Sequence, residues 1–329
     1  MAQTPVLEVQ DLRTYFYTRT GVVKAVDGVS FSLMPGETLG VVGESGSGKS
    51  MTALSIMGLV PKPAGKTVGG KVLLDGEDLL QKSASEMQHI RGRKICMILQ
   101  DPMTSLNPVY TVGNQLIETL RMREEGRGMG LKDRAVELLS KVKIASPENR
   151  MGNYPHQMSG GMRQRVVGAI AMSCEPEIII ADEPTTALDV TIQLQYLRLL
   201  KEIQASTGLA IIFITHDFGV VARMCDRVAV MYAGRIVEQG SVLDLFNHPS
   251  HPYTQALMAA VPKLEERVER LYSIEGQPPL LSNLPPGCRF EPRCAHAQER
   301  CRAEYPPSFT VREGHMADCW RMEPSWQTS

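Results

Sequence analysis

The chain has 329 residues, of which 43% are hydrophobic, 22% charged and 5% aromatic, with a formal net charge of −1. This length suggests about two domains of globular composition. The near-zero charge and the few aromatic residues argue against nucleic acid or an anionic membrane surface as a partner. No apolar run approaches the roughly 18 residues of a membrane span, and the N-terminus lacks a signal peptide, so we expect a cytoplasmic protein with reduced thiols.

Antiparallel strands are predicted near the N-terminus. The apolar and polar alternation over residues 6–17 predicts one strand, and residues 22–33 predict one or two more. Turns are expected at Asp27-Gly28 and at Pro35-Gly36, because these residue types favour tight reversals of the chain. We therefore expect β-hairpins in this part of the chain.

A glycine-rich stretch, LGVVGESGSGKS, occupies residues 39–50. An apolar strand enters a glycine-rich turn and then residues 51–57, which have helix-forming spacing, so both the context and the G-x-x-x-x-G-K-S pattern are those of a phosphate-binding P-loop. Lys49 is expected to reach the β- and γ-phosphates of a nucleoside triphosphate, and the Ser50 hydroxyl to bind Mg²⁺. The alternative is a glycine-rich turn without a ligand. The other residues expected at the nucleotide are Gly43, Glu44, Ser45, Gly46, Ser47, Gly48 and Met51. Glu44 and Ser45 are expected to contribute their backbone, and no role is assigned to their side chains.

Gln100 ends a predicted apolar strand. Residues 72–76 and 94–99 predict short strands, and the second leads directly to Gln100, ahead of Asp101-Pro102. A glutamine at this place can bind Mg²⁺ or orient an attacking water molecule. A lone glutamine is also a common polar end of a strand, which is the alternative.

Two helical regions follow. Residues 111–147 have helical spacing, interrupted by glycines at 126–130, and another helix is predicted over residues 162–173. Ser159 is a suitable N-cap for the second region, and the next two residues, both glycine, expose backbone N–H groups at its start. By itself this pattern fits any capped helix.

Carboxylates follow another buried strand. Residues 178–181 form a continuous apolar run, typical of a parallel strand, and lead to Asp182 and Glu183. A buried acidic pair is unfavourable unless it serves a charge, so we expect Asp182 to bind Mg²⁺ and Glu183 to be a general base or to position the attacking water. His216 follows the strand predicted at residues 210–214 and is placed to contact a γ-phosphate. A structural strand-end histidine is the alternative.

The tail of the chain differs from the rest. Strands alternating with helices predict a mainly parallel sheet up to about residue 232, and prolines then mark a loop-rich tail. Four thiolates in this tail suit tetrahedral Zn²⁺ or an iron–sulfur cluster, but their spacing matches neither the paired C-x-x-C zinc pattern nor the common ferredoxin run, so inert thiols are the alternative. These cysteines are Cys288, Cys294, Cys301 and Cys319.

In their order along the chain, the site residues resemble the nucleotide-binding subunit of ABC transporters over residues 6–240. The matching residues are Lys49, Gln100, Ser159, Gly160, Gly161, Asp182, Glu183, Asp189 and His216. The resemblance implies ATP and Mg²⁺ as ligands, with adenine stacked on Phe16 or its neighbour Tyr15. It also implies a head-to-tail pair of subunits, in which the signature loop Ser159 to Gly161 meets the γ-phosphate bound by the partner and Asp189 lies in the contact between subunits.

Three segments resemble the peptide-import branch of that family: residues 100–108 (QDPMTSLNP), 181–191 (ADEPTTALDVT) and 251–254 (HPYT). Nickel and glutathione importers share much of this sequence, so their solutes are alternatives. The tail resembles the C-terminal extension of peptide-importer ATPases, some of which hold a [4Fe–4S] cluster, and this implies a cluster on the four cysteines, with Zn²⁺ as the alternative. Met158 and Met162 replace the Leu and Gln of the family signature LSGGQ, so the amide of that Gln is missing.

The expected fold class is α/β: an ABC-type P-loop ATPase with a mainly parallel core sheet, an N-terminal antiparallel β subdomain, a helical signature subdomain and a small loop-rich, metal-binding C-terminal extension. We expect the nucleotide-binding domain at residues 1–245, with the helical subdomain at about 101–175, and the extension at residues 246–329.

The expected function is the ATP-hydrolysing motor of an importer of di- or oligopeptides. The resemblance implies two transmembrane permease subunits, a second homologous ATPase subunit in a heterodimer, and an extracytoplasmic solute-binding protein. It places the chain peripherally on the cytoplasmic face of the bacterial inner membrane, with no nucleic acid partner. The rival class is a soluble ABC ATPase acting on DNA or ribosomes, but residues 50–159 leave no room for the long coiled coil of repair ATPases and the chain has one cassette rather than two. A P-loop kinase or GTPase does not account for Ser159 to Gly161.

Overall fold

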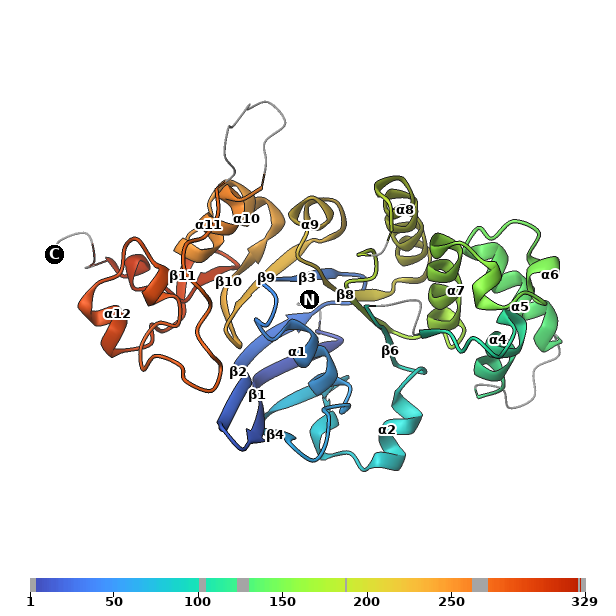
Figure 1. Cartoon of the computed structure of the whole chain (residues 1–329), viewed down its shortest axis with the longest axis horizontal. Helices are drawn as coiled ribbons and strands as arrows, with labels where there is room; N and C mark the ends of the chain where they lie inside the picture. The colour runs from blue at the N-terminus through green and yellow to red at the C-terminus, as the bar shows by residue number, and fades with distance from the viewer. Residues whose placement is uncertain are drawn as a thin grey trace. The chain divides into compact units, whose positions relative to one another are not determined.

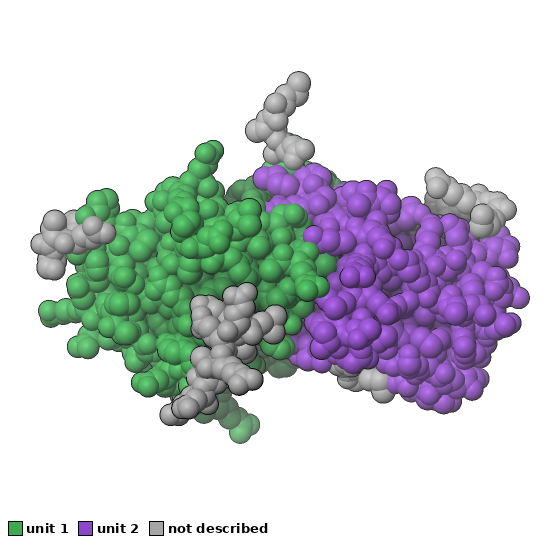
Figure 2. All heavy atoms as spheres, turned by 90° about the horizontal axis from the view of Figure 1, so that it is seen from above, with its two compact units in different colours: residues 1–33, 38–81, 214–329 green, residues 34–37, 82–213 purple. Residues whose placement is uncertain are grey.

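The computed structural model describes residues 4–100, 105–122, 130–186, 188–261, 272–324 and 326. The chain divides into two compact units, coloured green and purple in Figure 2. Unit 1 comprises residues 1–33, 38–81 and 214–329, and unit 2 comprises residues 34–37 and 82–213. None of the helices among the described residues combines the length and the apolar composition that a membrane span requires.

Unit 1 begins with an antiparallel sheet, drawn mostly in blue in Figure 1. Its strand order is β2-β1-β4-β5. The apolar residues Leu7, Val9 and Leu12 of the first strand are buried, as its alternating pattern predicts. The strands are β1 (Leu7–Thr18), β2 (Gly21–Leu33), β4 (Gly65–Leu74) and β5 (Glu77–Asp78).

The turn predicted at Asp27-Gly28 is wrong, because β2 runs through it as one strand. The pairing with β1 skips one residue there: Leu12 faces Val29, and Arg13 faces Asp27. Gly28 has φ +91°, so the glycine forms a bulge in the strand rather than a reversal of the chain. The turn predicted at Pro35-Gly36 is confirmed.

Unit 1 also holds a mixed set of strands in the order β11-β12-β10-β9-β3. The strands β3 and β9 are parallel, whereas β10 pairs antiparallel with both β9 and β12. The sheet is therefore mixed rather than mainly parallel at this edge. The strands are β3 (Thr38–Val42), β9 (Arg227–Tyr232), β10 (Arg235–Ser241), β11 (Phe309–Arg312) and β12 (His315–Ala317).

The C-terminal tail is built into unit 1, and it contains strands that the sequence pattern did not predict. The tail strand β12 covers the edge of β10, which would otherwise expose unpaired backbone groups. Next to this pairing, the buried Glu238 carboxylate accepts hydrogen bonds from the N–H groups of Ser250 (2.8 Å) and His251 (2.9 Å) and lies 2.7 Å from the ring of His315. One carboxylate thus joins three separate segments of the chain.

Helices and short 3₁₀ turns complete unit 1. An aromatic cluster packs α11 and the tail on β9: the ring centroid of Tyr232 lies 4.5 Å from that of Tyr253 and 5.3 Å from that of Phe290. The helices are α1 (Lys49–Ile56), α9 (Phe218–Met224), α10 (Val242–Asn247), α11 (Pro252–Ala259) and α12 (Glu299–Ala303), and the 3₁₀ turns are Leu79–Gln81, Glu291–Arg293 and Trp320–Met322.

Unit 2 holds β6 (Ile95–Ile98), β7 (Ile178–Asp182) and β8 (Ala210–Ile214) in the order β8-β7-β6. Every residue of β7 and β8 is buried, as their continuous apolar runs predict, and β6 is parallel to β7. The last residue of β8, Ile214, already belongs to unit 1.

The green helices α4, α5 and α7 of unit 2 pack on one another (Figure 1). In α4, Leu116 and Leu120 are buried one helical turn apart, so a single apolar face meets the neighbouring helices. The helices of unit 2 are α2 (Ala84–Ile90), α4 (Val112–Arg121), α5 (Leu131–Lys141), α6 (Pro147–Arg150), α7 (Gly160–Met172) and α8 (Val190–Thr207), with a 3₁₀ turn at Pro155–Gln157.

Some predicted features lie outside the described residues. They are the chain stop at Asp101-Pro102, the glycines at 126–129 and Ala187 of the segment 181–191. The last glycine of the predicted interruption, Gly130, is the N-cap of α5.

Candidate functional site

In unit 1, the P-loop joins β3 to α1. The strand ends at Val42 and the helix begins at Lys49, preceded by Gly48 in the left-handed region with φ +107°. A Cβ atom on Gly43 would lie 2.1 Å from the carbonyl oxygen of Met231, so only glycine lets the loop pass this close to the end of β9. Gly46 also has a positive φ, +78°, but a Cβ there would meet no atom within 4 Å.

The Lys49 amine is turned into the loop. Its Nζ donates to the carbonyl oxygens of Gly43 (2.7 Å) and Glu44 (3.0 Å), and the residue is only 6% exposed. The neighbouring Ser50 is exposed at the first turn of α1. The Ser47 hydroxyl is buried without a hydrogen-bond partner among the described residues. A cation and the N-terminus of a helix meet at this loop, which is the arrangement that binds a polyphosphate.

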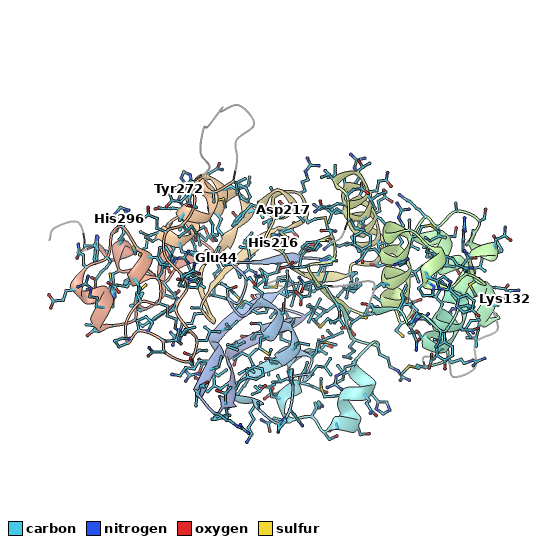
Figure 3. All side chains as sticks on the ribbon, viewed as in Figure 1. Glu44, Lys132, His216, Asp217, Tyr272 and His296 are labelled. Carbon is cyan, nitrogen blue, oxygen red and sulfur yellow. The ribbon has the colours of Figure 1, made fainter. Side chains whose placement is uncertain are left out.

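The sequence pattern did not predict the contacts that Glu44 of the P-loop makes with the C-terminal part of the chain. The Glu44 carboxylate, labelled in Figure 3, pairs with Arg293 through two contacts of 2.7 and 3.0 Å. The N–H of Glu44 donates to the hydroxyl of Tyr253 (2.9 Å). The only signal for these contacts was the HPYT segment, which contains Tyr253.

His216, labelled in Figure 3, lies in unit 1, and its side chain is exposed. The N–H of Thr215 donates to the carbonyl oxygen of Val41 (3.2 Å), so His216 starts beside the end of the strand that leads into the P-loop. The next residue, Asp217, caps α9 by accepting from the N–H groups of Gly219 and Val220. The structure therefore brings His216 and the P-loop to the same strand end.

The two candidate adenine-stacking residues lie on β1 in different surroundings. The Tyr15 hydroxyl donates to Asp27 (2.5 Å), whose other carboxylate oxygen pairs with Arg289. The Phe16 ring lies beside Gly65, where a Cβ atom would approach it to 2.8 Å. Tyr15 is thus held by a polar network, whereas Phe16 has an apolar contact.

In unit 2, the structure brings Gln100 and Glu183 together. Glu183 directly follows β7 with φ +44°, an uncommon conformation for a residue with a side chain. Its carboxylate accepts from Gln100 Nε2 (3.1 Å) and from the hydroxyl of Thr186 (3.0 Å). Asp182, the last residue of β7, is 4% exposed. Thr186 was not among the predicted site residues.

The predicted signature loop begins α7 as expected. The Ser159 hydroxyl accepts from the N–H of Met162 (3.3 Å), and Ser159 and Gly160 are exposed. A Cβ atom on Gly161 would lie 2.5 Å from a methyl group of Ile192, so this glycine lets α7 pack closely on α8. Asp189 caps α8 by accepting from the N–H of the same Ile192 (3.0 Å).

The four tail cysteines line one small cavity of about 20 Å³ in unit 1. Burial raises the pKa of Cys288 to about 11 and that of Cys319 to about 12. Among the described residues, no group of three His, Cys, Asp or Glu side chains is arranged to hold a metal ion. The donor set therefore suits a metal in kind but not in position, and the predicted [4Fe–4S] cluster is not confirmed.

The fold and the loop define a P-loop ATPase of the ATP-binding cassette type. Residues 26–186 match the family "ABC transporter", and residues 237–301 match "Oligopeptide/dipeptide transporter, C-terminal region". The chain belongs to the ABC transporter family of ATP-binding proteins, in the branch with the oligopeptide/dipeptide transporter C-terminal region.

Two curated relatives resemble the chain over nearly its whole length, and a solved structure resembles it over a smaller part. The oligopeptide transport ATP-binding protein OppD of Bacillus subtilis is 51% identical over 98% of this chain and 90% of its own. The dipeptide transport ATP-binding protein DppD of the same organism is 50% identical over 96% of this chain and 94% of its own. The dimeric structure of MJ0796, a bacterial ABC transporter cassette, is similar with a TM-score of 0.64 and 27% identity, over 72% of this chain and 98% of that one.

Proposed function

We propose that this chain is the ATP-hydrolysing subunit of a membrane importer of di- or oligopeptides. The observation that carries the proposal is the carboxylate of Glu183, fixed by Gln100 and Thr186 directly after a buried strand, in a chain that also has a complete P-loop. A carboxylate in such a position can take the proton of an attacking water molecule.

We assign the following roles in ATP hydrolysis to the main predicted residues. The P-loop N–H groups and Lys49 would bind the β- and γ-phosphates, Lys49 exchanging its present carbonyl acceptors for phosphate oxygens. Ser50, Asp182 and Gln100 would hold Mg²⁺, which neutralises phosphate charge. Glu183 would accept a proton from the water that attacks the γ-phosphorus, the bond to the β-phosphate oxygen would break, and ADP and phosphate would leave. The remaining contacts would be His216 to the γ-phosphate and Phe16 to adenine.

A second ATPase subunit would complete the site. Ser159 and Gly160 are exposed at the start of α7, which supports a role for Ser159, Gly160 and Gly161 toward the γ-phosphate bound by the partner. Asp189, exposed at the start of α8, would lie in the contact between subunits. We propose a heterodimer, as the resemblance to peptide importers implies.

The Glu183→Gln variant tests the hydrolytic role. The amide cannot accept the proton, so we expect ATP binding to remain and hydrolysis to fall by about 10²- to 10⁴-fold. Glu177→Gln is the matched control: Glu177 directly precedes β7, as Glu183 directly follows it, and it is exposed. Turnover near that of the unmodified protein in Glu183→Gln would contradict the assignment.

The proposed partners are two transmembrane permeases, a solute-binding protein and a second ATPase subunit, with this chain on the cytoplasmic face of the bacterial inner membrane. The similarity to the OppD and DppD proteins supports peptide as the solute. We propose a cassette at residues 1–245, with its helical part at about 101–175, and an extension at 246–329. Co-purification of permeases from membranes and ATP-dependent uptake of labelled dipeptide would support the proposal; uptake of nickel or glutathione instead would contradict it.

We also propose that the tail binds a metal, as a [4Fe–4S] cluster or as Zn²⁺. The support is that Cys288, Cys294, Cys301 and Cys319 line one cavity, and binding would require their side chains to turn toward a common point. Such a centre would stabilise a tail that has little apolar core of its own. Metal analysis and the visible spectrum of anaerobically purified protein test this: iron or zinc lost in Cys294→Ser supports a site, and protein without either metal contradicts it.

A further inference from the structure

The tail segment between the first two cysteines of the cavity carries two arginines that pair with carboxylates outside the tail. Cys288 and Cys294 bound the segment, and Arg289 and Arg293 lie just inside it. The side chains of both arginines are largely buried, with 7% and 4% exposed. Each guanidinium pairs with a carboxylate of the N-terminal part of unit 1, more than 200 residues away in sequence.

Arg293 holds the second residue of the P-loop. Its two terminal nitrogens contact the two carboxylate oxygens of Glu44, at 2.7 and 3.0 Å, which is the bidentate geometry that fixes both partners in direction as well as distance. Its Nε donates to the carbonyl oxygen of Glu275 (3.0 Å), and one terminal nitrogen also contacts the Tyr232 hydroxyl (3.3 Å). The guanidinium of Arg293 is thus held by the tail and by β9, and its pair with Glu44 restricts the position of the P-loop.

Arg289 supports the same loop by another route. It pairs with Asp27 and donates to the carbonyl oxygen of Ala233 (2.5 Å). The next residue, Gly234, donates its N–H to the carbonyl oxygen of Ser47 (2.8 Å) and accepts from the N–H of Asp27 (2.8 Å). Arg289 therefore holds the turn that contacts the middle of the P-loop.

The tail also lines a small pocket beside the loop. Residues 44–47 and the tail residues Pro278, Pro279 and Leu281 line this pocket together. The carbonyl oxygen of Leu281 accepts from the N–H of Lys24 (3.0 Å), which fixes that part of the tail on β2. Backbone, side-chain and apolar contacts therefore all join the tail to the loop and its surroundings.

We propose that Arg293 is a positioning residue for nucleotide binding, which acts through Glu44 to hold the P-loop in its phosphate-binding shape before ATP arrives. The proposal rests on the proposed function, because it assigns a role in the binding of ATP. Preorganised loops bind more tightly because less conformational freedom is lost on binding. Because the Glu44 carboxylate is paired with a tail arginine, the contact should affect nucleotide affinity more than turnover.

The test compares ATP affinity and turnover in matched variants of the full chain. In Arg293→Met we expect the Kd for ATP to rise about tenfold, because the free energy that orders the loop falls by about that of one charge-assisted hydrogen bond. We expect kcat in the assembled ATPase to change less than twofold. Arg293→Lys, which keeps the charge, should recover part of the affinity. The control is Arg312→Met, which removes a tail arginine that pairs with Asp244 at 3.8 Å, has a side chain 48% exposed and makes no contact with Glu44 in that pair.

The Glu44→Gln variant keeps the test decisive if Arg293→Met does not fold, and a double-mutant cycle is added where both variants fold. Glu44→Gln removes the same pair from the loop side, and the combined variant should be no weaker in ATP binding than the weaker single variant. An unchanged Kd in both single variants, with only the melting temperature lowered, would overturn the proposal. If the unmodified protein and Arg312→Met also fail to bind ATP, the proposed function itself is wrong and the positioning role falls with it.

Discussion

Replacing Gly43 by alanine should destabilise the protein because of one backbone contact. The new Cβ would lie 2.1 Å from the carbonyl oxygen of Met231 and 2.9 Å from the hydroxyl of Ser47, and φ at Gly43 is +152°. The nearer atom belongs to the backbone at the end of β9, so it can move only if the strand moves. Overpacking of this kind costs about 1–3 kcal/mol and a glycine-only backbone conformation about 1–3 kcal/mol. We expect a loss of about 3–4 kcal/mol from these two effects.

Gly46→Ala is the control within the same loop. Gly46 also has a positive φ, +78°, but a Cβ there meets no atom within 4 Å, so only the backbone strain of about 1–2 kcal/mol remains. Urea unfolding of the nucleotide-free proteins, followed by circular dichroism, measures both changes in the free energy of unfolding. Equal destabilisation by the two substitutions would refute the argument that the Met231 carbonyl sets the requirement for glycine at position 43.

Two further predictions concern the pH dependence and a helix cap. Burial disfavours the Asp27 carboxylate, but its contacts with Tyr15 and Arg289 outweigh burial and lower the pKa of Asp27 from its ordinary value. The ionised Asp27 therefore stabilises the folded protein fully above a pH of about 4, and this stabilisation is lost as the pH falls further. In urea unfolding, Asp27→Asn should lower the free energy of unfolding by about 3–5 kcal/mol at pH 7 and by less at pH 3. Ser159→Ala removes the cap of α7 and should lower the free energy of unfolding by about 1 kcal/mol in the same assay; no change would show that water replaces the hydroxyl.

The sequence predicts those parts of the structure whose signals are local. The strands β7 and β8 are continuous apolar runs, and both are buried along their whole length. The P-loop pattern predicts a strand, a turn and a helix, and Ser159 caps the helix that follows it. In each case the residues that decide the structure are neighbours in the chain.

The parts that the sequence did not predict depend on distant partners. Gly28 suggested a turn, but pairing of β2 with β1 turns it into a bulge. The tail strands have only three and four residues, too few for a recognisable alternation, and they form because β10 offers an edge. Arg293 and Glu44 are 249 residues apart, so no local pattern connects them. Cysteine spacing, likewise, does not fix how far apart the sulfur atoms lie.

The buried Glu238 limits where this chain can be cut for biochemical work. An expressed fragment that stops at residue 245 would lack Ser250, His251 and His315. The Glu238 carboxylate would then stay buried without any of the hydrogen-bond partners described for it. Such a fragment would also lose β12 and leave β10 open to pairing with other molecules. Aggregation of the shortened protein would therefore result from the exposed edge of β10 and the unpaired Glu238 carboxylate. It would not show that the nucleotide-binding part itself is unstable.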